Sequence, residues 1–225
     1  MKLFIDDANV ENIKRLMDIY PIDGVTTNPK ILAKIEKDPR ETLTEIRQII
    51  GKSAMLFVQV LPLKAEEMVK DAEYIMTLCG QNTVVKIPSI PEGFKAIRML
   101  EKEGISTCGT VVYTPMQALL AAKAGASYVA PYVSRIDEMG FSGIDVVKEI
   151  QNILDIHNID CEVLAASFRD CQQLLELYSY GIASITATPE MIESLAKNVE
   201  VDEMIRLFAS SFEKLTGKKK MTDLR

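Results

Sequence analysis

Several features that identify common enzyme classes are absent from this chain of 225 residues. It has one histidine, His157, which gives little support to a multi-histidine metal site or a Ser-His-Asp triad. His157 lies near the end of a helical pattern, and we interpret it as a helix-terminal residue rather than a catalytic base. No G-x-G-x-x-G follows a predicted strand and no G-x-x-x-x-G-K-S/T occurs, so a nucleotide cofactor is not indicated. We therefore predict neither a metal nor a cofactor.

Features of exported, membrane-spanning and nucleic-acid-binding proteins are also missing. The cysteines contain no C-x-x-C pair, and no run approaches the roughly 18 apolar residues that cross a bilayer. The segment MKLFIDDANV is too polar for a signal peptide, so we expect a cytoplasmic protein with reduced thiols. A net charge of −6 and a pI of about 5.0 disfavour nucleic acid and anionic membranes as partners, because both would repel the chain. The thiols are Cys79, Cys108, Cys161 and Cys171.

Short apolar segments alternate with longer amphipathic ones along the chain. The apolar segments are rich in β-branched residues and show no polar alternation, which is typical of strands covered on both faces. The predicted strands are 2–5, 23–27, 54–60, 83–88, 105–113, 127–133, 161–167 and 183–187. The predicted helices are 10–20, 29–37, 40–50, 64–78, 92–103, 116–124, 144–156, 171–180 and 189–197.

Repetition of strand and helix about eight times predicts an α/β fold, a parallel (β/α)₈ TIM barrel. An open doubly wound sheet is the alternative, but the number of units and the missing glycine-rich fingerprint favour the barrel. We predict a single domain over residues 1–225, with an additional C-terminal helix at about 201–215 and a basic tail, GKKKMTDLR.

Polar side chains occur where the predicted strands end. In a parallel barrel these ends meet at the rim that carries the active site. Some of these residues could instead have a purely structural role. Asp6 could cap the following helix, although Asp7 or Asn9 fits that role better. Thr110 could be a β-branched filler of the strand, and the arginines could be ordinary surface charges. Thr26 and Asn28 also fit a turn before a proline. The candidate site residues are Asp6, Thr26, Asn28, Gln59, Lys86, Thr110, Tyr132, Arg135, Ser167 and Arg169.

Lys86 is the candidate nucleophile. It stands in VVKIP, inside a predicted central strand, where a lysine is costly unless it is neutral or paired. Desolvation lowers the pKa of an ammonium group and frees the amine for attack on a carbonyl. The alternative is a lysine that extends from the strand end into solvent. Asp6, at the same predicted rim, is a candidate proton carrier.

Cations near the ends of the sixth and seventh predicted strands indicate an anionic substrate. Arg135 and Arg169 follow these strands, and Ser167 lies close to Arg169 in the chain. The planar guanidinium group donates two parallel hydrogen bonds to phosphate, and barrels often bind phosphate after their last strands. The residues therefore suit carbonyl chemistry on a phosphorylated sugar.

The stretches GVTTNPKI, VVKIP, GTVVYTPMQALLAAKAGASYVAPYVSR and LAASFR resemble the small transaldolase and fructose-6-phosphate aldolase family, in order and over nearly the whole chain. The resemblance implies class I chemistry on a (β/α)₈ barrel, without metal or cofactor. Lys86 would form a Schiff base with the donor ketone, Asp6 would assist proton transfer, and Asn28 would bind donor hydroxyls. Two further sets are implied: Gln59, Thr110 and Tyr132 would hold a catalytic water, with Tyr132 also exchanging a proton, and Arg135, Ser167 and Arg169 would bind the aldehyde's phosphate.

Two activities occur on such a scaffold. Transaldolases resembling this chain carry Glu, Phe and Ser where it has Gln59, Tyr132 and Ala130, so the resemblance is to the aldolase branch. It implies cleavage and formation of fructose 6-phosphate from dihydroxyacetone and glyceraldehyde 3-phosphate. Transaldolase activity, within the pentose phosphate pathway, is the first alternative, and a non-catalytic barrel that binds sugar phosphate is the second.

The resemblance also implies a homo-oligomer, a pentamer or decamer whose C-terminal helix reaches a neighbour. The last predicted helix has an apolar set suited to such a contact, namely Met204, Ile205, Leu207, Phe208 and Phe212. The alternative is that this helix packs on its own barrel.

Overall fold

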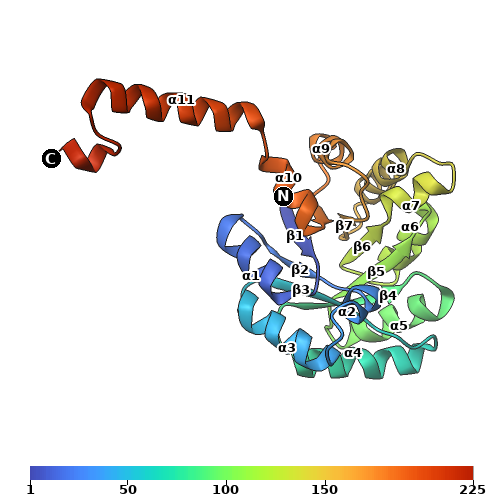
Figure 1. Ribbon diagram of the computed structural model, residues 1–225. Helices are drawn as coiled ribbons and strands as arrows, with labels where there is room; N and C mark the ends of the chain where they lie inside the picture. The colour runs from blue at the N-terminus through green and yellow to red at the C-terminus, as the bar shows by residue number, and fades with distance from the viewer. Residues whose placement is uncertain (225) are drawn as a thin grey trace. The chain divides into compact units, whose positions relative to one another are not determined.

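The computed structural model describes residues 1–224, whose eight strands form one closed barrel (Figure 1). All neighbouring strands are parallel, and β1 pairs with both β2 and β8. The strands are β1 (Lys2–Asp6), β2 (Gly24–Thr26), β3 (Met55–Gln59), β4 (Thr83–Pro88), β5 (Thr107–Val112), β6 (Tyr128–Pro131), β7 (Glu162–Ala165) and β8 (Ser184–Ala187). The predicted barrel is therefore confirmed.

Helices separate the successive strands and cover the outside of the barrel (Figure 1). They are α1 (Val10–Ile19), α2 (Pro29–Ala33), α3 (Pro39–Ile50), α4 (Ala65–Cys79), α5 (Pro91–Lys102), α6 (Pro115–Lys123), α7 (Val133–Glu138), α8 (Gly143–Ile156) and α9 (Cys171–Tyr180), and α10 (Pro189–Ala196) follows the last strand. The chain continues with α11 (Val199–Thr216) and the 3₁₀ helix η1 (Met221–Leu224).

Two apolar clusters follow from the alternation of side chains along each strand. The larger cluster lies between the strands and the helices and includes Ile5, Val85 and Ile185. The smaller cluster fills the barrel interior with Phe4, Phe57, Val84, Cys108, Tyr128, Ala130 and Leu164. Because the interior is packed with side chains, a cavity is possible only where the strands end.

After several strands, the next helix begins with an N-cap residue whose side chain accepts a hydrogen bond from a free backbone N–H group of the first turn. Asn28 caps α2 with Pro29 at the first helical position, and Thr114 forms a reciprocal capping box with Gln117 at the start of α6. Asn9 rather than Asp6 caps α1, which leaves the Asp6 carboxyl available for other contacts. These short connections hold the loops close to the barrel rim.

Several predicted elements have different ends in the structure, and two of these differences change the local backbone. The sixth strand was expected to extend to residue 133, but Val133 begins α7, a helix that the sequence did not predict. Regular pairing of β6 ends at Pro131, and Tyr132 forms an isolated bridge to Ala166. The helix expected over 29–37 ends at Ala33, and the backbone then takes the left-handed conformation at Glu36, with φ of 54°.

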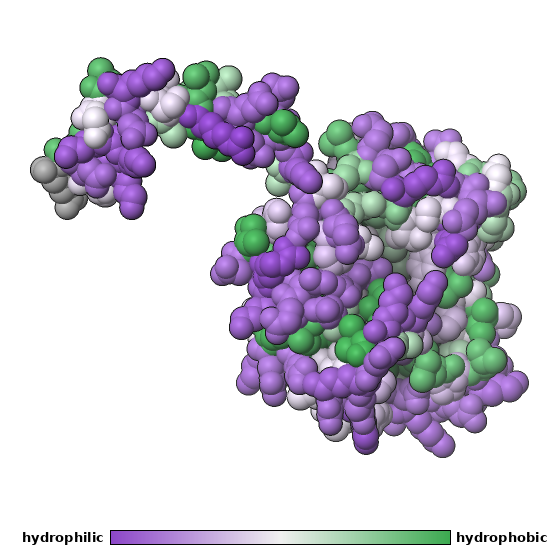
Figure 2. Space-filling model, viewed as in Figure 1, coloured by the Kyte–Doolittle hydropathy of each residue, from purple (hydrophilic) through white to green (hydrophobic). Residues whose placement is uncertain are grey.

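The chain divides into two compact units, Met1–Ile192 and Glu193–Arg225. The first contains the barrel. In the second, α11 forms at the position predicted for an additional C-terminal helix, and the basic tail includes η1. No residue of α11 is buried, and Figure 2 shows apolar side chains among its polar ones.

Other sequence expectations concern single residues. His157 is the exposed C-cap of α8, as its position in the pattern predicted. All four cysteines are free, and three of them are buried. Within residues 1–224, no helix combines the length and the apolar character that crossing a membrane requires.

Candidate active site

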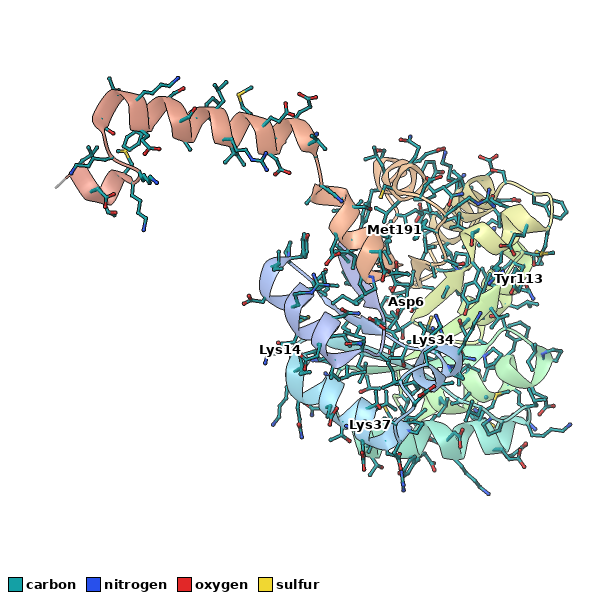
Figure 3. The ribbon with its side chains drawn as sticks, in the orientation of Figure 1. Asp6, Lys14, Lys34, Lys37, Tyr113 and Met191 are labelled. Atoms are coloured by element: carbon teal, nitrogen blue, oxygen red, sulfur yellow. The ribbon has the colours of Figure 1, made fainter. Side chains whose placement is uncertain are left out.

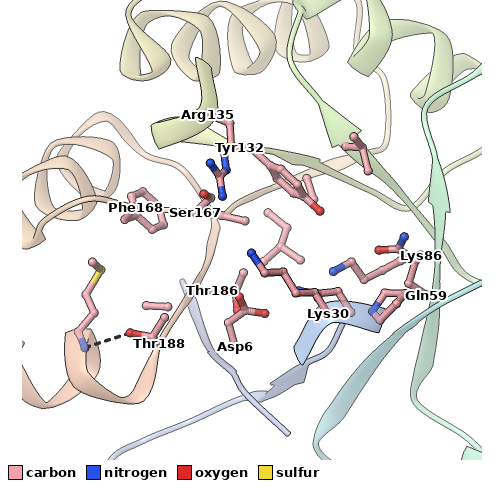
Figure 4. A pocket seen from close by; sticks show the side chains of 18 residues that line it. Asp6, Lys30, Gln59, Lys86, Tyr132, Arg135, Ser167, Phe168, Thr186 and Thr188 are labelled. Atoms are coloured by element: carbon pink, nitrogen blue, oxygen red, sulfur yellow. Dashed lines mark hydrogen bonds between the residues drawn. The ribbon is translucent and has the colours of Figure 1, made fainter. Parts of the chain in front are cut away.

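A cavity of about 520 Å³ opens at the carboxyl ends of the strands (Figure 4). Its walls include seven of the ten predicted site residues, namely Asp6, Asn28, Gln59, Lys86, Tyr132, Arg135 and Ser167. They come from β1, β3, β4 and α7, from the N-cap of α2 and from the segments beside α7 and β7, so residues far apart in the sequence meet here. Figure 3 shows Asp6 in the barrel and Met191 on α10, which lines the same cavity.

The period of two along a strand explains why these side chains face inward. Phe4, Phe57 and Val84 belong to the interior cluster, and each stands two residues before a polar residue of the cavity. The polar residues on the same strand faces are Asp6, Gln59 and Lys86. Each strand thus packs the barrel with its earlier residues and supplies the cavity with its last ones.

Lys86 lines the cavity and is 5% exposed. Its Nζ donates a hydrogen bond of 2.9 Å to the carbonyl oxygen of Thr27. Its neighbour in register on β5 is Cys108, a fully buried residue whose thiol pKa is raised by that burial to about 12. The amine therefore has one fixed acceptor, and Figure 4 shows Gln59 beside it.

Asp6 is held by a short chain of hydroxyl groups. Thr26 donates from Oγ1 to Asp6 Oδ1 over 2.7 Å, and Oγ1 of Thr186 lies 2.6 Å from Oγ1 of Thr26. Burial raises the pKa of the Asp6 carboxyl, against the opposing effects of the Lys86 charge and the Thr26 hydrogen bond. A carboxyl with a raised pKa is better suited to both accept and return a proton near neutral pH. Thr26 does not line the cavity and acts on it through Asp6.

Tyr132 enters the cavity from the opposite part of the barrel. Its hydroxyl lies 3.0 Å from Oγ1 of Thr110, and its ring meets Tyr113 edge to face at 6.0 Å between centroids. Thr110 is fully buried and does not itself line the cavity. The pair presents two hydroxyl groups that share one hydrogen bond, which leaves donor and acceptor capacity for a further polar partner.

A bulge near the end of β5 shapes this wall. The register with β6 shifts between Gly109 and Val112, and Val111 has a positive φ of 59°. A β-branched residue rarely takes this conformation, because its branched Cβ crowds the backbone. The extra residue allows Val111 to line the cavity while Val112 joins the outer core.

The predicted phosphate-binding residues are not all in the cavity. Arg135, on α7, and Ser167, which has a positive φ of 62°, both line it. Arg135 is also paired with Glu138 at 2.7 Å. Arg169 is absent from the walls: its side chain is 59% exposed, and its Nη2 lies 3.8 Å from Oδ2 of Asp137. The role implied for Arg169 therefore stays a prediction.

Asn28 has two roles that the sequence left as alternatives. Its Oδ1 accepts a hydrogen bond of 3.0 Å from the backbone N–H of Ile31, so it caps α2. The residue also lines the cavity. Since the side-chain oxygen is engaged in the cap, the amide N–H groups are the part of Asn28 that remains for a ligand.

Sequence reasoning did not select several residues of the walls. The most polar of these is Lys30, whose side chain reaches into the cavity in Figure 4. The others include Val111, Phe168, Thr186, Thr188 and Met191. Lys30, Phe168 and Thr188 follow strand ends within a few residues, a signal that would have found them. Over residues 1–224, no group of three or more His, Cys, Asp or Glu side chains is arranged to hold a metal ion.

Comparisons with known proteins bear on the fold and on the family of the chain. A native KDPGal structure superimposes with a TM-score of 0.59 at 16% identity, over 83% of this chain and 82% of the other. A mandelate oxidase mutant with a monooxide FMN adduct gives a TM-score of 0.57 at 12% identity, over 80% of this chain and 59% of the other. Identities this low establish the barrel alone. The model of the transaldolase/fructose-6-phosphate aldolase family matches residues 3–224. The chain therefore belongs to the transaldolase/fructose-6-phosphate aldolase family, a family of aldolase- and transaldolase-type enzymes.

Proposed function

We propose that the chain is a class I aldolase that cleaves and forms fructose 6-phosphate through a Schiff base on Lys86. The observation that carries this proposal is the placement of Lys86, which is nearly buried and lines a cavity that Asp6 and Tyr132 also line. An amine, a carboxyl group with a raised pKa and a phenol around one space are the groups that imine formation and proton transfer require.

In the cleavage direction, Lys86 Nζ adds to C2 of the ketose, and loss of water leaves a protonated imine. The C3–C4 bond then breaks, its electron pair moves into the enamine, and the C4 hydroxyl proton passes to a cavity base. Glyceraldehyde 3-phosphate leaves, C3 takes up a proton, and water hydrolyses the imine to release dihydroxyacetone. Asp6 and Tyr132 are the side chains suited to move these protons.

The proposed substrate orientation follows from the charges on the walls. Arg135 and Ser167 would hold the phosphate on the side of β6 and β7, since guanidinium and hydroxyl groups both donate to phosphate oxygens. Asn28 would donate its amide N–H groups to the donor hydroxyls. This leaves the reacting carbonyl near Lys86.

Borohydride trapping tests the imine directly. With dihydroxyacetone or fructose 6-phosphate present, reduction should add mass at Lys86, detected by peptide mass spectrometry. Lys86→Met should abolish the adduct, whereas Lys95→Met should keep it, because Lys95 is an exposed lysine paired with Glu66 outside the cavity. Failure of the wild type to form an adduct would instead support a barrel that only binds sugar phosphate.

Transaldolase activity is the second candidate, since the family includes both reactions. Cleavage is favoured by Tyr132 and Thr110, whose two hydroxyl groups lie 3.0 Å apart where they can hold a water against the imine. Gln59, beside Lys86 in Figure 4, completes the proposed water site. Release of glyceraldehyde 3-phosphate from fructose 6-phosphate, measured with and without erythrose 4-phosphate, separates the two. Turnover that requires the acceptor would identify a transferase.

We also propose that the enzyme is a homo-oligomer, a pentamer or decamer. The support is α11, which has no buried residue although it carries large apolar side chains such as Met204, Ile205 and Phe208. Exposed apolar residues at helical spacing are typical of a contact surface.

A further inference from the structure

The side of the cavity proposed to bind phosphate is built from two separate segments. One is α7 with Arg135, which follows β6, and the other is residues 166–170 with Ser167, which follows β7. Helix α7 has six residues, too few to be stable without tertiary anchors. The position of Arg135 relative to Ser167 therefore depends on contacts between the two segments.

The first contact joins the beginning of α7 to the cavity wall. The backbone N–H of Ser134 donates to the carbonyl oxygen of Ser167 at 2.7 Å, and the two Oγ atoms lie 2.8 Å apart. Both residues belong to or adjoin the proposed binding site, so this contact cannot be tested separately from it.

The second contact joins the end of α7 to the segment that contains Arg169, outside the cavity. Asp137 accepts from the backbone N–H of Gly143 at 2.8 Å and from Nε2 of Gln173 at 2.7 Å. Gln173 in turn accepts, through Oε1, the backbone N–H of Arg169 at 2.9 Å. One carboxylate thus links α7, the start of α8, α9 and the loop after β7. The Asp137 side chain is 18% exposed, so these hydrogen bonds are shielded from water.

The same carboxylate lies near the guanidinium group of Arg169 but does not bind it tightly. The separation of 3.8 Å is an ion-pair contact without hydrogen-bond length, and the Arg169 side chain is largely exposed. Both Asp137 oxygens are already occupied by neutral N–H donors. A phosphate dianion would offer Arg169 more charge and free acceptor oxygens. The weak contact with Asp137 would therefore not prevent Arg169 from binding a phosphate.

We propose that Asp137 is a positioning residue for recognition of the substrate's phosphate monoester, and that Gln173 transmits its position to Arg169. The proposal rests on the proposed function, because it deepens the role of the same site. Asp137 acts through Arg135, two residues before it on α7, and through the backbone of Arg169. It does not line the cavity and is not expected to touch the reacting atoms.

The test compares acceptors with and without phosphate. With dihydroxyacetone as donor, Asp137→Asn and Gln173→Met should each raise KM for glyceraldehyde 3-phosphate about tenfold, the loss expected for a charge-assisted hydrogen-bond contact. KM for unphosphorylated glyceraldehyde and kcat for both acceptors should stay within about twofold of the wild type. The double variant should lose little more than either single one, because both changes break the same link.

The chain offers a matched control. Gln151 donates to Asp155 at 2.8 Å on α8, a glutamine–aspartate hydrogen bond outside the cavity, so Asp155→Asn should leave both KM values unchanged. If Asp137→Asn does not fold, Gln173→Met decides, since it keeps the carboxylate and its bond to Gly143. KM values that rise equally for both acceptors, or that stay unchanged or fall for the phosphorylated one, would overturn the proposal.

A second measurement does not depend on catalysis. Calorimetric titration with inorganic phosphate should show weaker binding to Gln173→Met than to the wild type, by a similar factor. If the wild type forms no imine but this difference is present, the proposed aldolase function fails and the positioning role stands. If the imine forms and phosphate binds both proteins equally, the positioning role fails alone.

Discussion

Thr26 donates its hydroxyl hydrogen to Asp6 at 2.7 Å, while Thr26 and Thr186 are 2.6 Å apart at their Oγ1 atoms. Because the Thr26 hydrogen is directed at the carboxylate, Thr186 must be the donor in the second contact. The Asp6 carboxyl is thereby oriented from one side and leaves its other oxygen for the cavity.

Replacing Asp6 should change how stability depends on pH. Burial raises the pKa of Asp6, so the folded state holds this proton more tightly than the unfolded chain. The contribution is complete below the ordinary pKa of an aspartate and is lost as the pH rises through the raised value. Asp6→Asn, which cannot ionise, should be more stable than the wild type at neutral pH, with the difference vanishing in acid. Urea unfolding of both proteins at several pH values measures this, and a difference independent of pH would contradict it.

Removing the Tyr132 hydroxyl should favour transfer over cleavage. In Tyr132→Phe, Thr110 loses its partner and the proposed water is held less well, so hydrolysis of the imine should slow by about a hundredfold. The measurement is the ratio of erythrose 4-phosphate-dependent transfer to free dihydroxyacetone release. Tyr113→Phe is the matched control, because Tyr113 packs edge to face on the Tyr132 ring, whereas the hydroxyl that lies beside Thr110 is that of Tyr132. An unchanged ratio in Tyr132→Phe would argue against water activation.

Lys30 should contribute to attraction of anionic substrates. It lines the cavity of a protein with net charge −6, where a single cation has a marked effect on the local potential. Lys30→Met should raise KM for glyceraldehyde 3-phosphate by about three- to tenfold at low salt, and less at high salt. Lys14→Met, on α1 and outside the cavity walls, should have no such effect (Figure 3). Equal effects of both substitutions would show a general charge effect only.

Assembly should depend on the apolar stripe of α11. Val201, Met204, Ile205, Phe208 and Leu215 are all exposed; the first four recur at three- and four-residue spacing, and Leu215 follows Phe208 by two helical turns. Phe208→Glu would place a charge in this stripe and should shift the protein to smaller species in sedimentation velocity experiments. Ser210→Glu, outside the stripe on the same helix, should leave the assembly unchanged. A wild type that sediments as a monomer would disprove the oligomer itself.

The sequence was sufficient for the barrel because the evidence is local and repeated. Unbroken β-branched segments separated by amphipathic ones indicate covered parallel strands, and about eight such units indicate closure. The sequence was a less reliable guide to the residue at which a strand ends. Val133 continues an apolar run and was predicted as strand, but it begins α7, and the one-residue insertion at Val111 has no signature in a run of similar residues.

The residues of the candidate site were predictable where they stand at the ends of strands. Polar residues at strand ends indicated Asp6, Gln59 and Lys86, because the side-chain period of two places them on the face of the preceding interior residues. Lys30 was not predicted, although it follows the end of β2 by four residues and the same rule would have included it. The link between Asp137 and Gln173 was not predictable, because it depends on how segments after different strands meet, and their spacing in the sequence carries no information about that distance.

By itself, the sequence determined the order of the elements, the residue types at each strand end, and through these the family. The tertiary structure alone decided which side chains share one cavity, that Lys86 is nearly buried beside the carbonyl oxygen of Thr27, and that Arg169 lies outside beside Asp137. The physical reason is that propensity and periodicity act over a few neighbouring residues. Barrel closure, by contrast, sets distances between residues that are many tens of positions apart.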